Sequence, residues 1–381
     1  MPLLTLARIL FGLVSLVILA SAAYLLWSWW DGAWIADPAG RLHLAREPWR
    51  LWTGLALLAW SFGGRWLVTP LIARDDGEPV RADATPGERF QSPTGSWIHV
   101  ETEGPAGAPT IIMTHGWGFD STVWRRLRDS LSDRFRLVSW DLPGLGRSQA
   151  APDGVALERF ALDLLAVLER QPGPAILVGH SIGGMTIQTL LRDHAEHVAG
   201  RVRGVVLMNT TYTNPLRTMI LAPVASALRW PVLEPAMRLA IWLKPLVWLS
   251  VWQSYLSGSA HLANRIGFSG EVTRAQLEHV TRLTTRNSPS VQARGNLAMF
   301  RWTADGALPR AGAPVLVIAG GRDIVTKPEA SDVLARAAGR ARLEVVGEAN
   351  HLGVLEQAPL YATLVRAFAD EVADGAITLA R

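Results

Sequence analysis

The 381-residue sequence contains no cysteine and only two lysines, and charged residues make up just 18% of it. The absence of cysteine excludes disulfide bonds, thiol catalysis and cysteine-ligated zinc or iron–sulfur sites. Basic residues exceed acidic ones by four, and no basic block occurs, which argues against a nucleic-acid partner. Because 49% of the residues are hydrophobic, the low charge indicates that part of the apolar surface faces lipid.

Two long apolar segments lie near the N-terminus. Residues 9–30 carry no charge over 22 positions and end among tryptophans, as expected for a helix that crosses a hydrocarbon core of about 30 Å and reaches the headgroups. Arg8 followed by Ala20-Ser21-Ala22 would also fit a signal peptide, although the apolar run continues past that point. Residues 51–72 form the second segment, which spans the membrane, is re-entrant, or packs on the soluble part.

The simplest interpretation of residues 1–73 is a membrane-anchoring helical hairpin with residues 31–50 as its loop. Residues 74–88 are polar and rich in proline and glycine, and are predicted to form a linker. Four arginines flank the hairpin on the side of the linker and three lie in the loop. This weakly favours a catalytic domain on the cytoplasmic side of a bacterial inner membrane.

From residue 89 onward, short apolar strands alternate with helical patterns. Such alternation predicts an α/β fold with a mostly parallel central sheet and helices on both faces. The alternation stops between residues 210 and 312, a stretch that is too long for a loop and is helical in composition. We therefore expect a core in two parts, 89–209 and 313–381, with a helical insertion over 210–312. The expected strands are 97–101, 110–114, 137–140, 175–178, 204–208, 315–319 and 343–346.

The most informative motif is Gly179-His180-Ser181-Ile182-Gly183, which follows a predicted strand and opens a predicted helix. Small residues on both sides of a serine allow a sharp strand-to-helix turn that lifts the hydroxyl above the sheet, next to a helix N-terminus. We interpret Ser181 as a nucleophile. The alternative is a glycine-rich turn whose serine only caps the helix.

At these residues the chain resembles the α/β-hydrolase superfamily, over about residues 88–373. His115-Gly116-Trp117-Gly118 stands where that family has its oxyanion loop, and Asp141–Ser148 matches the loop after the next strand. Asp323 and His351 stand where the family has its acid and its histidine. Asn350 departs from the glycine of many relatives. The resemblance implies a Ser181–His351–Asp323 triad with the backbone N–H groups of Trp117 and Ile182 as the oxyanion hole.

Other titratable residues are interpreted as structural. His115 and His180 are expected to shape their turns, and Asp141 is judged a weaker candidate for the triad acid than Asp323. His194, His197, His261 and His279 are expected at the surface. No His/Asp/Glu cluster has the spacing of metal ligands, so neither a metal nor a cofactor is expected.

The insertion corresponds to the position at which family members carry a cap over the active site. Residues 215–256 are divided into short pieces by Pro223, Pro231, Pro235 and Pro245, so one spanning helix is not expected. Trp242, Trp248 and Trp252 recur there among apolar residues. They are predicted to meet a lipophilic substrate or the bilayer, and the alternative is an ordinary cap core.

The sequence thus predicts a membrane-anchored serine hydrolase that cleaves a carboxylic ester of a lipophilic small molecule, with the lipid bilayer as its other partner. Thioesterase, carbon–carbon bond hydrolase, peptidase, cofactor-free haloperoxidase and acyltransferase activities are alternatives on the same fold. A catalytically inactive membrane scaffold is the alternative from another class. The sequence gives no oligomeric state.

Overall fold

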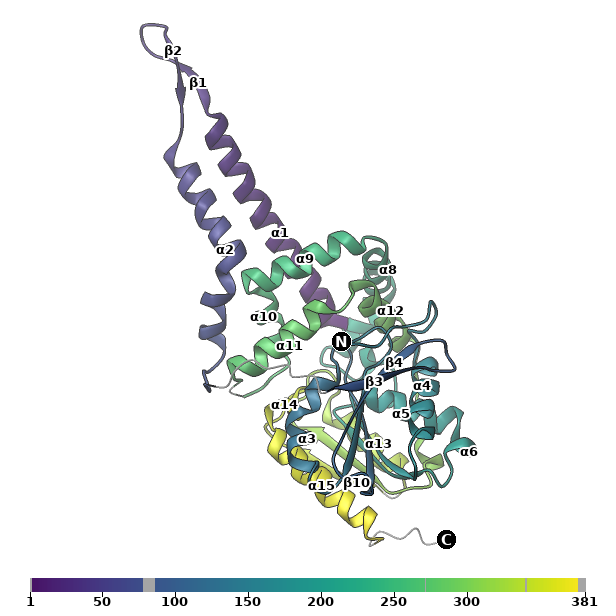
Figure 1. Ribbon diagram of the computed structural model, residues 1–381. Helices are drawn as coiled ribbons and strands as arrows, with labels where there is room; N and C mark the ends of the chain where they lie inside the picture. Colours follow the sequence, from purple (N-terminus) through teal and green to yellow (C-terminus); the bar gives the residue numbers. More distant parts are fainter. Residues whose placement is uncertain (1, 78–85, 271, 340, 376–381) are drawn as a thin grey trace.

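The computed structural model describes residues 2–77, 86–270, 272–339 and 341–375. Residues 78–85 of the expected linker therefore lie outside the described part. Figure 1 shows a sheet with helices on both faces, a helical layer over one end of the sheet, and a long two-helix hairpin that projects beyond that layer.

The central sheet has eight strands in the order β10-β9-β8-β7-β5-β6-β4-β3. The strands from β5 to β10 pair in parallel, whereas β4 runs antiparallel to both β6 and β3. This is the predicted α/β-hydrolase fold. The strands are β3 (Gly87–Gln91), β4 (Trp97–Glu103), β5 (Thr110–Thr114), β6 (Arg136–Trp140), β7 (Ala175–His180), β8 (Val202–Met208), β9 (Val315–Gly320) and β10 (Ala341–Val346).

Helices pack on both faces of the sheet because consecutive strand residues point to opposite sides. In β5, Ile112 joins the apolar cluster under α4, α5 and α13, while Ile111 and Met113 join the cluster under α3 and α15. Burial on both faces explains why the inner strands are almost continuously apolar. The helices of the core are α3 (Arg125–Leu131), α4 (Leu157–Glu169), α5 (Ile182–Asp193), α6 (Ala195–Val198), α13 (Pro328–Ala337), α14 (Gly353–Glu356) and α15 (Ala358–Ala373).

A layer of short helices, called the cap below, lies between β8 and β9 in the chain. Proline stands in the first turn of α7, α8, α9 and α12, where its missing N–H costs no helical hydrogen bond. The expected division by prolines is confirmed. The cap helices are α7 (Ala222–Ala227), α8 (Glu234–Trp242), α9 (Lys244–Ser257), α10 (Ser259–Arg265), α11 (Arg274–Arg286) and α12 (Pro289–Met299), with shorter turns η2 (Pro215–Arg217), η3 (Arg229–Leu233) and η4 (Leu308–Arg310).

The N-terminal hairpin consists of α1 (Pro2–Asp31) and α2 (Pro48–Ile72). Its expected loop contains an antiparallel strand pair, β1 (Ala33–Ala36) and β2 (Leu42–Ala45), that the sequence did not reveal. Both helices are long and apolar enough to cross a membrane, and 17% of each candidate span is buried. The case for membrane spans depends on helix length and composition alone, and a signal sequence or the core helix of a soluble protein can have the same length and composition.

The hairpin also packs on the cap, with α1 against α9 and α10 and α2 against α9. Gly64 permits this contact, because a Cβ there would lie 2.4 Å from the carbonyl oxygen of Ser257. The hydroxyl of Ser15 in α1 lies 3.0 Å from that of Ser257 and 2.9 Å from that of Ser259. Small and hydroxyl side chains thus bring the hairpin close to the cap, and α2 continues without a break through the glycines.

Candidate active site

Ser181 occupies the turn between β7 and α5 with a backbone that is unusual for a non-glycine residue, φ +53° and ψ −118°. Such strain persists only where the surroundings fix it, and it clusters at functional sites. Both flanking glycines are required. A Cβ on Gly179 would lie 2.5 Å from the carbonyl carbon of Gly183, and a Cβ on Gly183 would lie 2.1 Å from the carbonyl oxygen of Thr114. The turn therefore presents the serine hydroxyl beyond the end of the strand.

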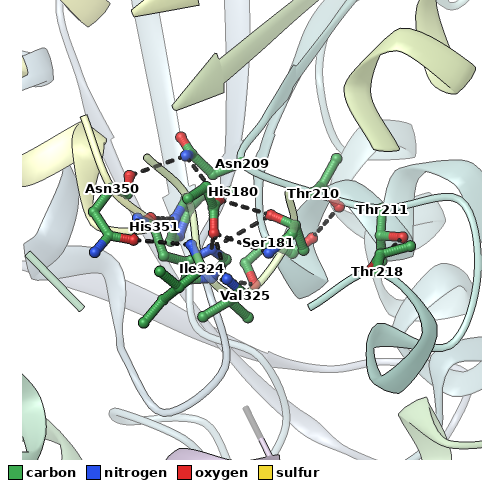
Figure 2. A network of polar contacts seen from close by, with 12 residues as sticks. His180, Ser181, Asn209, Thr210, Thr211, Thr218, Ile324, Val325, Asn350 and His351 are labelled. Carbon is green, nitrogen blue, oxygen red and sulfur yellow. Dashed lines mark hydrogen bonds and ion pairs between the residues drawn. The ribbon is translucent and has the colours of Figure 1, made fainter. Parts of the chain in front are cut away.

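The structure brings Ser181, His351 and Asp323 together in one chain of hydrogen bonds, although they come from three loops. Figure 2 shows Ser181 and His351 within this network. The Ser181 hydroxyl lies 3.0 Å from Nε2 of His351. Nδ1 of His351 lies 2.9 Å from Oδ2 and 3.1 Å from Oδ1 of Asp323. The side chains of His351 and Asp323 are fully buried. This geometry can pass a proton from the hydroxyl to the imidazole and hold the resulting cation beside a carboxylate.

Asp323 is held by further donors. The backbone N–H groups of Val325 and Thr326 donate to Oδ1 over 2.7 and 2.9 Å, and the Thr326 hydroxyl donates to Oδ2 over 2.8 Å. Burial alone would raise the pKa of Asp323. The neighbouring His351 and the amide of Asn209 outweigh burial and hold that pKa below its usual value. The carboxylate therefore stays ionised and fixes the orientation of the imidazole.

Two asparagines that the sequence did not single out as functional hold this arrangement. Asn209 donates to Oδ2 of Asp323 over 3.0 Å and accepts from the Tyr361 hydroxyl over 2.6 Å. Its own φ is +45°. Oδ1 of Asn350 accepts from the backbone N–H groups of Ile324 and His351 (Figure 2). A hint of the role of Asn350 was present in the sequence, because this residue replaces the glycine that many family members have before the histidine. No feature of the sequence pointed to Asn209.

The two residues expected to form an oxyanion hole lie at the loop after β5 and at the first position of α5. Ile182, as the first helical residue, has no carbonyl four residues earlier within the helix to accept its N–H. Among the hydrogen bonds of the described residues, none uses the backbone N–H of Trp117. The Trp117 indole packs beneath α12, where a Cβ on Gly295 would lie 2.0 Å from the ring, and it donates to the carbonyl of Gln292 over 3.2 Å.

His115 and His180, on either side of the site, are buried, and their side chains form hydrogen bonds with backbone groups. Nε2 of His115 accepts from the N–H of Leu142 over 3.0 Å, and Nε2 of His180 lies 2.9 Å from the carbonyl oxygen of His351. Burial lowers the pKa of both and brings that of His180 to about 3. Both rings are therefore neutral at pH 7, in keeping with a role in shaping the loops.

Asp141 fixes its own loop, accepting from the backbone N–H groups of Ser121 and Arg147 over 2.7 and 2.8 Å. The expectation for His261 was wrong, because this residue is buried, with Nε2 2.8 Å from a carboxylate oxygen of Glu278. Burial would raise the pKa of Glu278, but hydrogen bonds from His261 and its neighbours lower it to about 2. The helical position of His261 did not reveal that α11 covers it.

The structure does not bring the cap tryptophans to the triad. Trp242, Trp248 and Trp252 lie on the outer surface of α8 and α9 with 79%, 37% and 40% of their area exposed. Other residues of these helices, including Met237 and Val251, line a cavity within the cap. None of the three tryptophans is among the residues that line that cavity.

Comparison with known proteins assigns the fold to a family. Residues 109–358 match the family described as alpha/beta hydrolase fold. The match covers more than half of the chain, which therefore belongs to this family and is an enzyme of the α/β-hydrolase class. Ser181, Asp323 and His351 all lie within the matched residues.

Curated relatives match a smaller part. The pimeloyl-[acyl-carrier protein] methyl ester esterase of Vibrio vulnificus (strain YJ016) is 37% identical over 102 residues, 27% of this chain and 38% of the relative. The enzyme of that name from Nitrosomonas europaea is 37% identical over 114 residues, 30% of this chain and 41% of the relative. The matches thus span about two fifths of these relatives' length.

Solved structures of similar fold are less similar in sequence. An esterase from Exiguobacterium antarcticum superposes with a TM-score of 0.61 at 20% identity, over 74% of this chain and 99% of that one. The enol-lactonase from Burkholderia xenovorans LB400 superposes with a TM-score of 0.58 at 22% identity, over 74% of this chain and all of that one. At such identities the likeness concerns the fold alone.

Proposed function

We propose that the chain is a membrane-anchored serine hydrolase that cleaves a carboxylic ester of a lipophilic substrate. The observation that carries the proposal is the unbroken hydrogen-bonded chain from the Ser181 hydroxyl through His351 to Asp323. A serine hydroxyl is a weak nucleophile unless a base accepts its proton, and a buried, oriented imidazole is such a base.

The reaction proceeds in two halves. Oγ of Ser181 attacks the ester carbonyl while Nε2 of His351 takes the hydroxyl proton, and Asp323 stabilises the imidazolium. The backbone N–H groups of Trp117 and Ile182 bind the developing oxyanion. The loss of one such donor typically costs about 3 kcal/mol of transition-state stabilisation. His351 then gives its proton to the departing alcohol, and water, activated by the same imidazole, hydrolyses the acyl-enzyme.

Two features support an ester with a lipophilic part. The partial relatives are named as methyl ester esterases, so cleavage of a carboxylic ester is an activity recorded among similar chains. Within the cap, between its helices and α1, lies a cavity with largely apolar walls, including Ile9, Met237, Val247 and Val251. An apolar acyl chain is the kind of group that such walls stabilise.

The distribution of exposed tryptophans supports membrane anchoring. Trp27 and Trp30 in α1 and Trp52 in α2 are exposed near the free end of the hairpin, and Trp66 is exposed near the cap. Trp49 and Trp66 of α2 are both exposed and lie 17 residues apart, about 26 Å along a helix. This spacing is close to the thickness of a hydrocarbon core of about 30 Å, and indoles at both ends of an apolar segment are typical of two headgroup interfaces. Ile9 of α1 packs against Met237 and Ala240 of α8, so in this arrangement we expect the exposed Trp242, at the end of α8, to lie near the second interface.

The direct test is Ser181→Ala in the full-length protein solubilised in neutral detergent. We expect the variant to fold normally and to lose hydrolysis of aryl and glyceryl esters over a range of chain lengths. Matched thioesters in the same series would decide between esterase and thioesterase activity. Retention of more than a few per cent of the hydrolysis by Ser181→Ala would refute the proposal.

A further inference from the structure

The cavity within the cap is bounded by cap helices and, on one side, by α1, the first helix of the N-terminal hairpin. Ile9 of α1 packs with Met237 and Ala240 of α8 and with Ala293 of α12. These elements lie together beside the start of the chain (Figure 1). The N-terminal hairpin therefore completes the wall of the cavity as well as serving as the proposed anchor.

The same cavity reaches the loop that carries the proposed oxyanion donor. Gln292 lines the cavity, and its carbonyl accepts from the Trp117 indole. A Cβ on Gly118 would lie 3.1 Å from Nε2 of Gln292. Asn287, another lining residue, donates to the carbonyl of Gly118 over 2.7 Å. Two residues that line the cavity thus contact the Trp117–Gly118 loop, and Arg8 and Ile9 of α1 line the same cavity.

Arg8 is the one charged side chain that lines this cavity, as far as the structure describes it. Its guanidinium donates to the side-chain oxygen of Asn264, and its Nε is buried without a hydrogen-bond partner. No carboxylate among the described residues forms an ion pair with Arg8. Nε2 of Gln292 is a second buried donor without an acceptor. Arg8 is partly buried, and a guanidinium without a counter-charge can donate directed hydrogen bonds to an anion, so the cavity wall has unused capacity for one.

We propose that Arg8 is a specificity-determining residue that binds an anionic group, a carboxylate or a phosphate, carried by the substrate at the end remote from the ester. The inference rests on the proposed function and deepens it. The apolar walls hold the chain of the substrate, and the guanidinium accepts the oxyanion with directed hydrogen bonds. The substrate class is therefore an amphiphilic, negatively charged ester rather than a neutral glyceride.

The competing role for Arg8 is purely structural. Its bond to Asn264 joins α1 to α10, and the loss of that bond would loosen the hairpin from the cap for every substrate alike. The two roles differ in selectivity. A structural clamp affects neutral and anionic esters equally, whereas a binding group affects only the anionic ones.

The test compares aryl half-esters of linear dicarboxylic acids with aryl esters of monocarboxylic acids of the same chain length, and a third series carries a terminal phosphate. We expect the full-length enzyme in neutral detergent to prefer one anionic series by roughly 10- to 100-fold in kcat/KM. The preference should appear only at chain lengths that reach from Ser181 to Arg8. The phosphate series decides between the two anions.

Arg8→Gln should abolish the preference and leave kcat/KM for neutral esters within about twofold, while Arg8→Lys should keep part of the preference. Arg41→Gln, at the exposed tip of the hairpin, is the matched control and should change nothing. Equal losses for both ester classes, a lowered melting temperature without a change in the ratio, or no anionic preference in the parent enzyme would each overturn the role of Arg8. The rate measured with Ser181→Ala is subtracted from every rate. If nothing remains after this subtraction, the proposed hydrolase function fails, and that outcome is distinct from a failure of the role of Arg8.

Discussion

Trp242 offers the sharpest test of contact between the cap and the bilayer. It is 79% exposed at the end of α8. With about 250 Å² on a full indole side chain, it presents roughly 200 Å² to its surroundings. At about 25 cal/mol per Å² that area corresponds to about 5 kcal/mol if it is fully transferred to lipid, before ordering costs. Trp248 and Trp252, at 37% and 40% exposure, each offer about half as much.

Spin labelling would detect the contact directly. Because the chain has no cysteine, Trp242→Cys creates a single thiol for a nitroxide label in protein reconstituted into lipid nanodiscs. We expect the label to collide more often with oxygen, which concentrates in lipid, than with a water-soluble nickel chelate. Val345→Cys, on the edge strand β10 at a side chain that is 55% exposed, is the control. Its label should collide more often with the nickel chelate than with oxygen. The same aqueous accessibility at both positions would refute contact with the bilayer.

The functional consequence can be measured with Trp242, Trp248 and Trp252 all changed to serine. We expect kcat/KM to fall for a long-chain, membrane-dissolved ester and to stay nearly constant for a short, water-soluble one, with little loss of melting temperature. Trp302→Ser, at a side chain that is 4% exposed, should instead lower the melting temperature and both activities. An equal fall for both substrates in the triple variant, with lost stability, would make the three tryptophans part of the cap core. An unchanged ratio with full stability would contradict the bilayer contact as well.

Three further predictions concern stability. Burial raises the pKa of Asp163 to about 6, so the native state binds this proton more tightly than the unfolded state does. The free energy of unfolding should therefore fall by on the order of 2–3 kcal/mol as the pH rises from about 4 to 6. Urea unfolding at several pH values should show that Asp163→Asn removes this pH dependence. Glu101→Gln removes the 2.5 Å ion pair of the buried Arg128, which keeps only the partly exposed Glu103 at 3.3 Å, and should cost about 3 kcal/mol; a loss below 1 kcal/mol would contradict this. Gly64→Leu should separate α2 from α9 and lower the melting temperature in detergent, whereas Gly63→Leu, where a Cβ meets only ordinary contacts, should not.

The fold and the triad geometry could be anticipated because they depend on local signals. Each of the loops bearing Ser181, Asp323 and His351 follows a strand, and parallel strands bring their carboxyl ends to one edge of the sheet. The apolar strands and the glycines around Ser181 show directly in the sequence. The resemblance to a known family then supplied the order of the three residues.

The remaining features depend on contacts between residues far apart in the chain. Asn209 and Tyr361 meet through a hydrogen bond across 152 positions, and Arg8 and Asn264 meet across 256. No periodicity or spacing encodes such pairs. The orientation of the cap tryptophans could not be predicted either, because an apolar helix face has the same sequence pattern whether it points inward or outward. Here Met237 of α8 and Val251 of α9 line the cavity, and the three tryptophans are exposed.

The central claim is that Ser181 is the activated nucleophile of a working hydrolase. Its most direct test is to treat the folded, full-length protein with a fluorophosphonate probe and to identify the modified peptide by mass spectrometry. The account predicts one adduct on Ser181, none in Ser181→Ala, and a strongly reduced rate of labelling in His351→Ala at a temperature at which that variant is folded. The absence of labelling in a folded, solubilised protein, or an adduct on another residue, would contradict the account.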